Sequence, residues 1–255
     1  MYNDIVHTEE FNGYTINIRY DEGVECPFDD WDCEPPLAVY YDRGITEHAT
    51  QYGNVNSVPV LSRSQILANK SEILSMLGYA SFLQIRRDAY FDVDTDPVEY
   101  INEQISEHVD GLYDSERLDA LCDLYAMVGM PAVVKDVHGC SQGDWAKVLA
   151  VATPEFQKAC GNASDYDWVE SLKGAIQLYQ DWAFGNVYGY EVLDADGEHV
   201  DSCWGFFGDY DNPYGAMHEA EAAVNWRIEQ DKREHIEQIK TWIRNRVPFQ
   251  YRLTA

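Results

Sequence analysis

A serine between two glycines is the first candidate for chemistry in this sequence. Gly139-Cys140-Ser141-Gln142-Gly143 matches Gly-x-Ser-x-Gly, in which a serine nucleophile lies on a sharp turn between a strand and a helix. A strand is predicted before this segment, but the residues after it, Trp145 to Ala152, also have the pattern of a strand. The later histidines, among which no pattern selects a base, are His199, His218 and His235. We therefore interpret the segment as a glycine-rich turn and keep a hydrolase that uses Ser141 as an alternative.

A run of alternating acids is the second candidate, because it could bind a metal ion. Asp92, Asp94, Asp96 and Glu103 fall at positions 1, 3, 5 and 12 of an EF-hand calcium loop. Position 6 of such a loop requires a positive φ, and here it is Pro97, whose ring holds φ negative. The acids are better explained as the acidic segment that leads into a helix. A metal site at Asp92, Asp94 and Asp96 stays the weaker alternative.

Net charge is the strongest signal in the composition. The 255 residues include 45 Asp and Glu against 18 Lys and Arg, which gives a formal net charge of −27. A chain with this charge repels nucleic acids and anionic membranes and attracts basic partners. The sequence therefore predicts a basic protein or nucleoprotein complex as the partner, with no direct binding to nucleic acid or membrane. The alternative is that the acids serve solubility alone.

Other features of the sequence predict a soluble, cytoplasmic chain without a cofactor. The six cysteines form no Cys-x-x-Cys pair and have no zinc-finger spacing. The N-terminus lacks the pattern of a signal peptide, and no apolar run approaches the roughly 18 residues of a membrane span. The sequence contains neither a phosphate-binding loop nor a dinucleotide fingerprint, so no cofactor is expected. These patterns leave enzymatic activity undecided and favour binding without catalysis.

The acids are concentrated in three blocks. Residues 1–60 carry 12 acids and 2 basic residues, residues 91–125 carry 11 and 1, and residues 181–221 carry 10 and none. In the second block, acids recur every three or four residues along a predicted helix, which places them on one face. This row consists of Glu99, Glu103, Glu107, Asp110 and Asp114. The third block adds the partner-binding candidates Asp194, Asp196, Asp209 and Asp211. The alternative is an ordinary solvated helix face.

The order of the periodic segments predicts an α+β fold, with a mixed or antiparallel sheet, several packed helices and a long C-terminal helix. No repeat or linker divides the chain, so one domain is predicted over residues 1–255. The predicted strands are Gly13–Tyr20, Leu37–Tyr41, Phe82–Asp88, Ala132–Val137, Lys147–Ala152, Val187–Leu193 and His199–Trp204. The last two flank Asp194-Ala195-Asp196-Gly197, whose Asp-Gly step is typical of a hairpin turn.

Helical spacing and end signals predict the helices. Ser62 is a candidate cap for a helix that ends at Gly78, and Pro97 suits the first turn of the next one. Further helices are predicted at Ser115–Val128, Asp165–Trp182 and 213–246. In the last helix, basic residues interleave with acids, which favours ion pairs and leaves a homodimer through this helix open. These basic residues are Arg227, Lys232, Arg233, Lys240, Arg244 and Arg246.

The predicted hairpin also carries a small residue between two large ones. Gly189 lies between Tyr188 and Tyr190, and the partner strand carries Trp204. A glycine at this position leaves room for a large aromatic side chain from across the strand. Core packing is the favoured interpretation of these aromatic residues, and an aromatic patch that binds a partner is the alternative.

Five segments resemble a family of uncharacterised proteins from phage and mobile-element genomes. They are Leu37–Thr46, Ser141–Ala146, Val151–Glu155, Gly185–Tyr190 and Asp201–Gly208, and they span most of the chain in that order. The most specific parts are Tyr-Gly-Tyr at 188–190 and Ser-Cys-Trp-Gly-Phe at 202–206. The resemblance implies a phage setting and implies no particular chemistry.

The setting and the charge together predict an anti-defence function. We expect a phage-encoded protein that binds a nucleic-acid-binding immune effector of the host, such as a CRISPR complex or a restriction enzyme. Its acids would act as phosphate surrogates in a DNA-mimicking surface. The alternatives are a phage interaction or housekeeping protein without mimicry, and the hydrolase described above.

Overall fold

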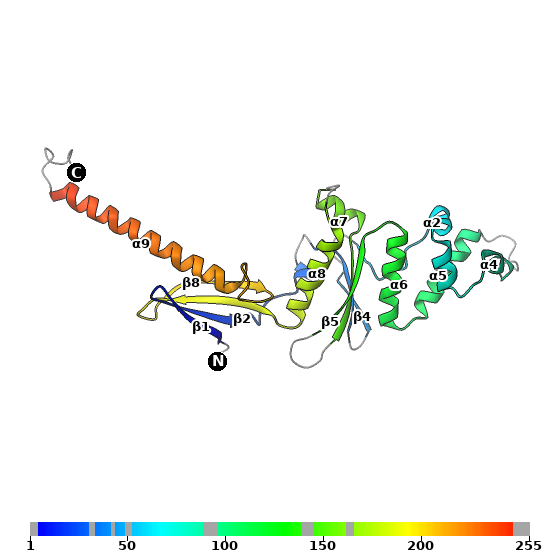
Figure 1. Ribbon diagram of the computed structural model, residues 1–255, viewed down its shortest axis with the longest axis horizontal. Coiled ribbons are helices and arrows are strands. Elements are labelled where there is room, and N and C mark those ends of the chain that lie inside the picture. Colours follow the sequence, from blue (N-terminus) through cyan, green and yellow to red (C-terminus); the bar gives the residue numbers. More distant parts are fainter. Residues whose placement is uncertain are drawn as a thin grey trace. The chain divides into compact units, whose positions relative to one another are not determined.

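The computed structural model describes residues 5–30, 34–41, 44–48, 53–88, 96–138, 145–161 and 166–246. Its contacts divide the chain into two compact units, a finer division than the one domain predicted for residues 1–255. Unit 1 comprises Met1–Val24 and Gly185–Ala255, and unit 2 comprises Glu25–Phe184. Each unit combines an antiparallel sheet with helices, which confirms the predicted α+β class (Figure 1).

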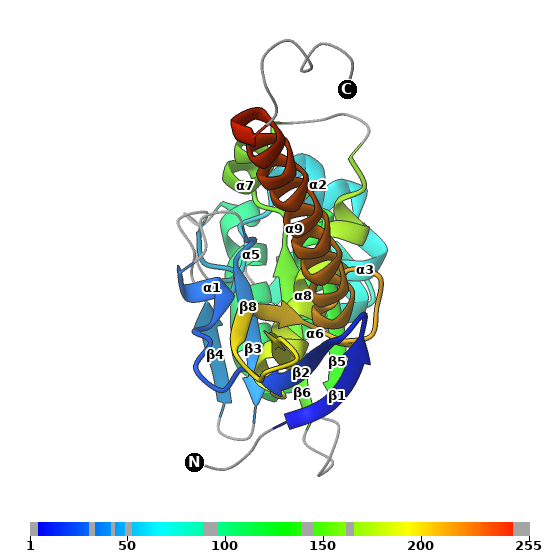
Figure 2. The same ribbon diagram turned by 90° about the vertical axis from the view of Figure 1, so that its left-hand side faces the viewer.

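Unit 1 is a four-stranded antiparallel sheet with one long helix against it. The strand order is β1-β2-β7-β8, so β2 and β7 are neighbours although all of unit 2 lies between them in the chain. Figures 1 and 2 show the first turns of α9 beside the strands of this sheet. The elements are β1 (Ile5–Phe11), β2 (Tyr14–Tyr20), β7 (Val187–Leu193), β8 (His199–Phe207) and α9 (Ala216–Arg246).

Alternation along the strands of unit 1 builds its core. Ile16 and Ile18 of β2 are fully buried and pack with Tyr188, Tyr190 and Val192 of β7. The first turns of α9 close this core with the buried residues Ala216, Met217, Ala220 and Val224. The predicted helix at 213–246 is confirmed, with its first residue at Ala216.

The glycine in β7 has the role that the sequence predicts. A Cβ atom at Gly189 would overlap the indole ring of Trp204, so only glycine leaves the space that the ring occupies. The pairing of β7 with β8 contains register shifts, and Tyr190 lies opposite Cys203. The ring of Trp204 therefore lies over the β7 backbone at Gly189 and stays about half exposed, at 48%.

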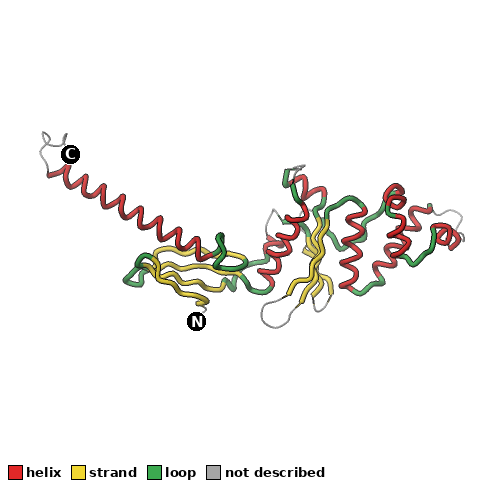
Figure 3. The backbone as a smooth tube through the Cα atoms, in the orientation of Figure 1, coloured by secondary structure: helices red, strands yellow, loops and turns green. Residues whose placement is uncertain are grey.

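Unit 2 is a four-stranded antiparallel sheet with helices on both faces (Figure 3). Its strands, in the order β4-β3-β6-β5, are β3 (Leu37–Tyr41), β4 (Gly44–His48), β5 (Ala132–His138) and β6 (Trp145–Val151). The helices are α1 (Pro27–Asp30), α2 (Arg63–Ala68), α3 (Lys70–Met76), α4 (Phe82–Asp88), α5 (Pro97–Asp110), α6 (Asp114–Met127), α7 (Pro154–Ala159) and α8 (Trp168–Ala183).

Successive residues of β3 point into two different cores of unit 2. Ala38 belongs to the core beneath α5 and α6, whereas Leu37 and Val39 belong to the core beneath α8. Because side chains alternate along a strand, one apolar strand can supply both cores. This explains why the sequences of β3 and β6 are nearly continuous apolar runs and do not alternate between apolar and polar residues.

Capping contacts confirm the predicted start of one helix and correct the ends of two others. Ser62 caps α2 in a capping box, in which its side chain accepts from the Gln65 backbone and the Gln65 side chain accepts from the Ser62 backbone. The helix predicted to end at Gly78 is two helices, because α2 ends at Ala68 and Asn69 separates it from α3. Asp167 caps α8 by accepting a hydrogen bond from the Glu170 N–H.

The strand predicted at Phe82–Asp88 is wrong, because these residues form the helix α4. The Ser81 carbonyl accepts hydrogen bonds from the N–H groups of Gln84 and Ile85, which starts a helical turn. Phe82 and Ile85, three residues apart, face the same core, while Leu83 between them is exposed. This spacing of three is typical of a helix and not of a strand. The elements β1, β4, α1 and α7 were not predicted.

The packing at Gly189 generates a stability test. We expect Gly189→Ala to lower the free energy of unfolding by about 1 to 3 kcal/mol, because the new methyl group overlaps a large ring. Urea unfolding measures this change. In a Trp204→Ala background the ring is absent, so the same substitution should cost much less. Equal losses in both backgrounds would show that the ring does not set the requirement for glycine.

Candidate functional site

The helix α5 is positioned by its first turn and by one apolar stripe. Pro97 occupies its first turn, and the Asp96 side chain caps the helix by accepting a hydrogen bond of 3.0 Å from the Val98 N–H. Ile101, Ile105 and Val109 are buried in the core of unit 2. Their spacing of four fixes which side of α5 faces inward and which side faces solvent.

Three glutamates lie on the outward side of α5. Glu99, Glu103 and Glu107 are all exposed and follow one another at intervals of four residues. At a rise of about 1.5 Å per residue, they are spaced about 6 Å apart along the helix axis. Within the described part of the chain, no lysine or arginine forms an ion pair with any of them. We call these three residues the glutamate row.

The next two acids of the predicted row behave differently. Asp110 is exposed, but its carboxylate lies 2.5 Å from the Arg117 guanidinium, so its charge is compensated locally. Asp114 was predicted on the same helix as Glu99, and this placement is wrong. The helix α5 ends at Asp110 with Gly111 as its C-cap, and Asp114 is the first residue of α6. The acids at both ends of this turn therefore belong to two helices.

The helix α6 contributes further exposed acids, which were not among the predicted partner-binding residues. Glu116, Asp119 and Asp123 are all exposed, at steps of three and four residues. Asp119 is paired with Lys147, whereas no such pair involves Glu116 or Asp123 among the described residues. The same helical spacing that revealed the row on α5 was available for α6. We call the glutamate row together with Asp114, Glu116 and Asp123 the acidic surface.

A groove borders the acidic surface between α3 and α6. It has a volume of about 640 Å³ and carries one carboxylate on each helix, Glu72 and Asp123, beside the side chains of Met76 and Met127. The Glu72 pKa is held below its ordinary value by a hydrogen bond from its backbone and then by one from the Ser71 hydroxyl. This carboxylate therefore remains charged under conditions in which an ordinary glutamate begins to take up a proton.

Neighbouring carboxylates affect the ionisation of two other groups. The pKa of the Cys122 thiol is raised to about 11, first by burial and then by the negative charge of Asp123, with a smaller contribution from Asp119. In unit 1 the pKa of Tyr190 is also raised, first by burial and then by Asp201, whose carboxylate accepts a hydrogen bond of 3.1 Å from the tyrosine hydroxyl. In both units the acidic side chains therefore disfavour further negative charge nearby.

The acids predicted in the third block belong to unit 1, and two of them have local structural roles. The Asp194 carboxylate accepts hydrogen bonds from the N–H groups of Asp196 and Glu198 in the hairpin turn, at 3.0 and 2.9 Å. The Asp209 carboxylate accepts one from the Asp211 N–H at 3.1 Å. Such contacts explain why an aspartate occurs in a turn, and no binding partner is needed for that explanation. In the glutamate row, Glu99 lies in the first turn of α5, where the helix dipole favours a carboxylate, and Glu107 accepts a hydrogen bond of 3.0 Å from the Gln104 side chain.

The two weaker catalytic and metal alternatives gain no support from their surroundings. Ser141, Asp92 and Asp94 lie outside the described residues. The strands on either side of Ser141, β5 and β6, pair antiparallel through His138 and Trp145, whereas a nucleophile elbow joins a strand to a helix. Asp96 caps α5, and no group of three or more His, Cys, Asp or Glu side chains in the described ranges could hold a metal ion.

Comparison of the chain with protein-family models, curated proteins and solved structures gave no match. The resemblance to a phage family therefore stays a prediction from the sequence. Over the described ranges, none of the helices combines the length and the apolar character that crossing a membrane requires. The acidic surface is the feature that the geometry singles out as the candidate site.

Repulsion within the glutamate row should lower the free energy of unfolding, so a substitution that removes it should raise this free energy. Glu103 has a glutamate four residues away on each side, so Glu103→Gln removes two like-charge pairs. We expect the free energy of unfolding in urea at low salt to rise by about 0.4 to 1 kcal/mol. The matched control is Glu170→Gln in the same unit, which removes the partner of Lys173 and should lower stability. A loss of stability for Glu103→Gln would contradict the repulsion.

The influence of the carboxylates on Cys122 can be measured directly. Asp123→Asn should lower the pKa of this thiol and so speed its alkylation by iodoacetamide at about pH 9.5. Because the folded pKa lies above the ordinary value of 9.0, the thiol contributes stability that is present below about pH 9 and lost as the pH rises toward 11. Mass spectrometry of the Cys122 peptide gives the rate. Glu116→Gln is the control, and equal rates in both variants would exclude a role for Asp123.

Proposed function

We propose that this chain is a phage-encoded anti-defence protein, which binds a nucleic-acid-binding immune effector of the host through the acidic surface on α5 and α6. The observation that carries the proposal is the glutamate row, in which three exposed carboxylates recur at regular intervals without a basic partner in the described chain. The partner would be a CRISPR complex or a restriction enzyme, whose nucleic-acid channel is basic.

The charge spacing supports competition with a nucleic acid. The row presents one carboxylate per about 6 Å of helix axis. Each strand of B-DNA presents one phosphate per about 3.4 Å of its axis. The row is therefore about half as dense as one strand, and the acids of α6 add to it. A basic channel that pairs arginines and lysines with successive phosphates could pair some of them with these carboxylates instead.

The energetics of α5 also support a binding role. Like charges four residues apart on a helix destabilise it by a few tenths of a kcal/mol per pair. A solvated helix face needs no such arrangement, because uncharged polar residues or mixed charges serve solubility at no such cost. An acidic surface on a partner-binding protein offsets this cost by steering association with a basic partner over long range.

The proposal requires binding that is sensitive to salt and to DNA. The full chain is immobilised and used to capture proteins at low salt from the lysate of a bacterium that carries CRISPR and restriction systems. We expect nucleic-acid-binding effectors to be captured, to elute at moderate NaCl and to be displaced by duplex DNA, because all three effects follow from a shared basic channel.

A matched pair of variants separates the glutamate row from net charge. Glu99→Gln, Glu103→Gln and Glu107→Gln together should reduce capture at least about tenfold, since three charge-assisted contacts are removed. The control neutralises three exposed glutamates elsewhere in the chain, Glu155, Glu170 and Glu198, and changes net charge equally. Equal capture by both triple variants, or capture of phage structural proteins alone, would refute the proposal.

A further inference from the structure

The groove between α3 and α6 has an apolar floor and a charged rim. Met76, Ala120 and Met127 are partly buried and pack against the core of unit 2, so they form the floor. Glu72 of α3 and Asp123 of α6 are exposed, one on each wall. The volume of about 640 Å³ lies within the roughly 300 to 1,000 Å³ of ligand pockets. The groove can therefore hold a group that is apolar along its length and charged at its end.

The negative charge of this groove has no counter-ion within the described part of the chain. No lysine or arginine is among the described residues that line it, and neither Glu72 nor Asp123 forms an ion pair there. The basic residue nearest to Glu72 in the sequence, Lys70, lies over the Phe82 ring, 5.4 Å from its centre. A cation from another molecule would therefore meet two uncompensated carboxylates in the groove.

Both carboxylates keep hydrogen-bonding capacity for such a cation. An ionised carboxylate offers about four lone-pair sites to donors. Glu72 uses part of this capacity on its own backbone N–H and on the Ser71 hydroxyl, which donates at 2.9 Å. No side chain of the described residues donates to the Asp123 carboxylate. Further N–H donors can therefore be accepted on both walls.

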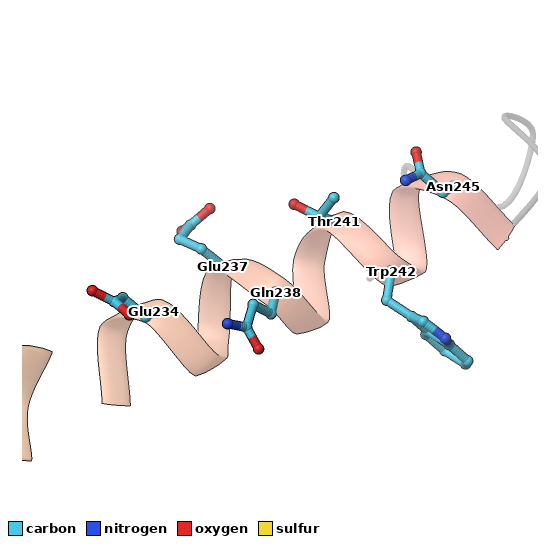
Figure 4. Close-up of a pocket in the computed structure, with 6 residues that line it drawn as sticks. All are labelled: Glu234, Glu237, Gln238, Thr241, Trp242 and Asn245. Atoms are coloured by element: carbon cyan, nitrogen blue, oxygen red, sulfur yellow. The ribbon is translucent and has the colours of Figure 1, made fainter. Parts of the chain in front are cut away.

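A second depression, on the surface of α9, lacks these features. Figure 4 shows Glu234, Gln238 and Trp242 among the residues around it, and all of its lining residues belong to this one helix. Trp242 is 55% exposed, and Arg246 of the same helix lies over its ring, 5.0 Å from the centre. The depression on α9 therefore has a single wall, and the chain supplies its own cation there.

The chemistry of the α3–α6 groove fits an arginine side chain. A guanidinium has five N–H donors in a planar fork, so it can bond carboxylates on two walls, whereas an ammonium is a compact and strongly hydrated charge. The methylene stem of an arginine covers apolar surface while its head stays polar. The flexible thioethers of Met76 and Met127 can adapt to such a stem. Arginine is also among the residues that most often anchor protein interfaces in pockets.

We propose that the groove receives an arginine of the protein partner, with its stem on Met76 and Met127 and its guanidinium between Glu72 and Asp123. This inference rests on the proposed function, because the partner is the effector that the acidic surface binds. The glutamate row would attract the basic partner over long range, and the groove would fix its position by holding one side chain.

Methionine methyl groups report on the groove directly. The chain has five methionines, and Met76 and Met127 line the groove. Propylguanidinium, the side chain of arginine without its backbone, should shift the carbon-13 methyl signals of these two and leave Met130 and Met217 in place. Butylammonium, the side chain of lysine, should bind at least about threefold more weakly. Absence of both shifts, or equal shifts at Met130 and Met217, would overturn the inference.

The two carboxylates are tested in the same titration. Glu72→Gln combined with Asp123→Asn should raise the Kd for propylguanidinium at least about fivefold, because both charged acceptors are lost. The matched control is Glu155→Gln combined with Asp196→Asn, two exposed acids outside the groove, which should leave the Kd within about twofold. Equal Kd values for the two double variants would show that the groove carboxylates do not hold the cation.

Filling the groove tests whether the partner uses it. Ala126→Arg places a long cationic side chain on the exposed rim and should reduce capture of the effector at least about tenfold, although every carboxylate is kept. The control is Ala159→Arg, which makes the same change at an exposed alanine of α7. Circular dichroism checks that both variants keep their helix content.

The outcomes separate this inference from the proposed function. Equal capture by the two arginine variants would overturn the inference, and capture that still depends on the glutamate row would leave the proposed function standing. Capture of no effector by the unchanged chain would refute the proposed function instead. The methyl shifts of Met76 and Met127 would in that case still show a site for a guanidinium group.

Discussion

Repulsion among acidic side chains constrains the whole structure. With 45 acids and 18 basic residues, the chain cannot pair most of its carboxylates internally, and an unpaired carboxylate is too costly to bury. Among the described residues the buried polar side chains are Asn17, Thr153 and Asp181, and the Asp181 carboxylate accepts a hydrogen bond from Gln177. The other described acids lie on partly or fully exposed faces of strands, helices and turns. Each unit therefore forms its core mainly from apolar side chains and keeps nearly all of its described charge at the surface.

The use of the few basic residues decides where negative charge remains. Arg117 compensates Asp110, Lys147 compensates Asp119, and α9 pairs acids with bases along its own length. The glutamate row is left without a partner in the described chain, although a single lysine four residues away would have relieved it. The glutamate row is thus the part of α5 that remains free to attract a basic partner.

Local signals in the sequence predicted the elements that carry strong periodicity or a recognisable end. The buried stripe of α5, the cap at Ser62 and the Asp-Gly hairpin were all recognisable, and Gly189 indicated the aromatic ring that now covers it. The edge strands β1 and β4 were missed because more than half of their residues are polar, and backbone pairing with β2 and β3 places them. The strand predicted at Phe82–Asp88 failed because a short apolar run fits two periods. Asp114 was misplaced because the end of α5 at Gly111 depends on a turn that helical spacing does not reveal.

Cross-linking between the chain and a captured partner tests the central account most directly. A carbodiimide joins carboxylates to nearby lysine amines without a spacer, so it reports which acids lie against the partner. The account predicts cross-links from Glu99, Glu103 and Glu107 to lysines of the partner's nucleic-acid channel, and their loss when duplex DNA is present. Cross-links confined to other acids of the chain, or unaffected by DNA, would contradict it.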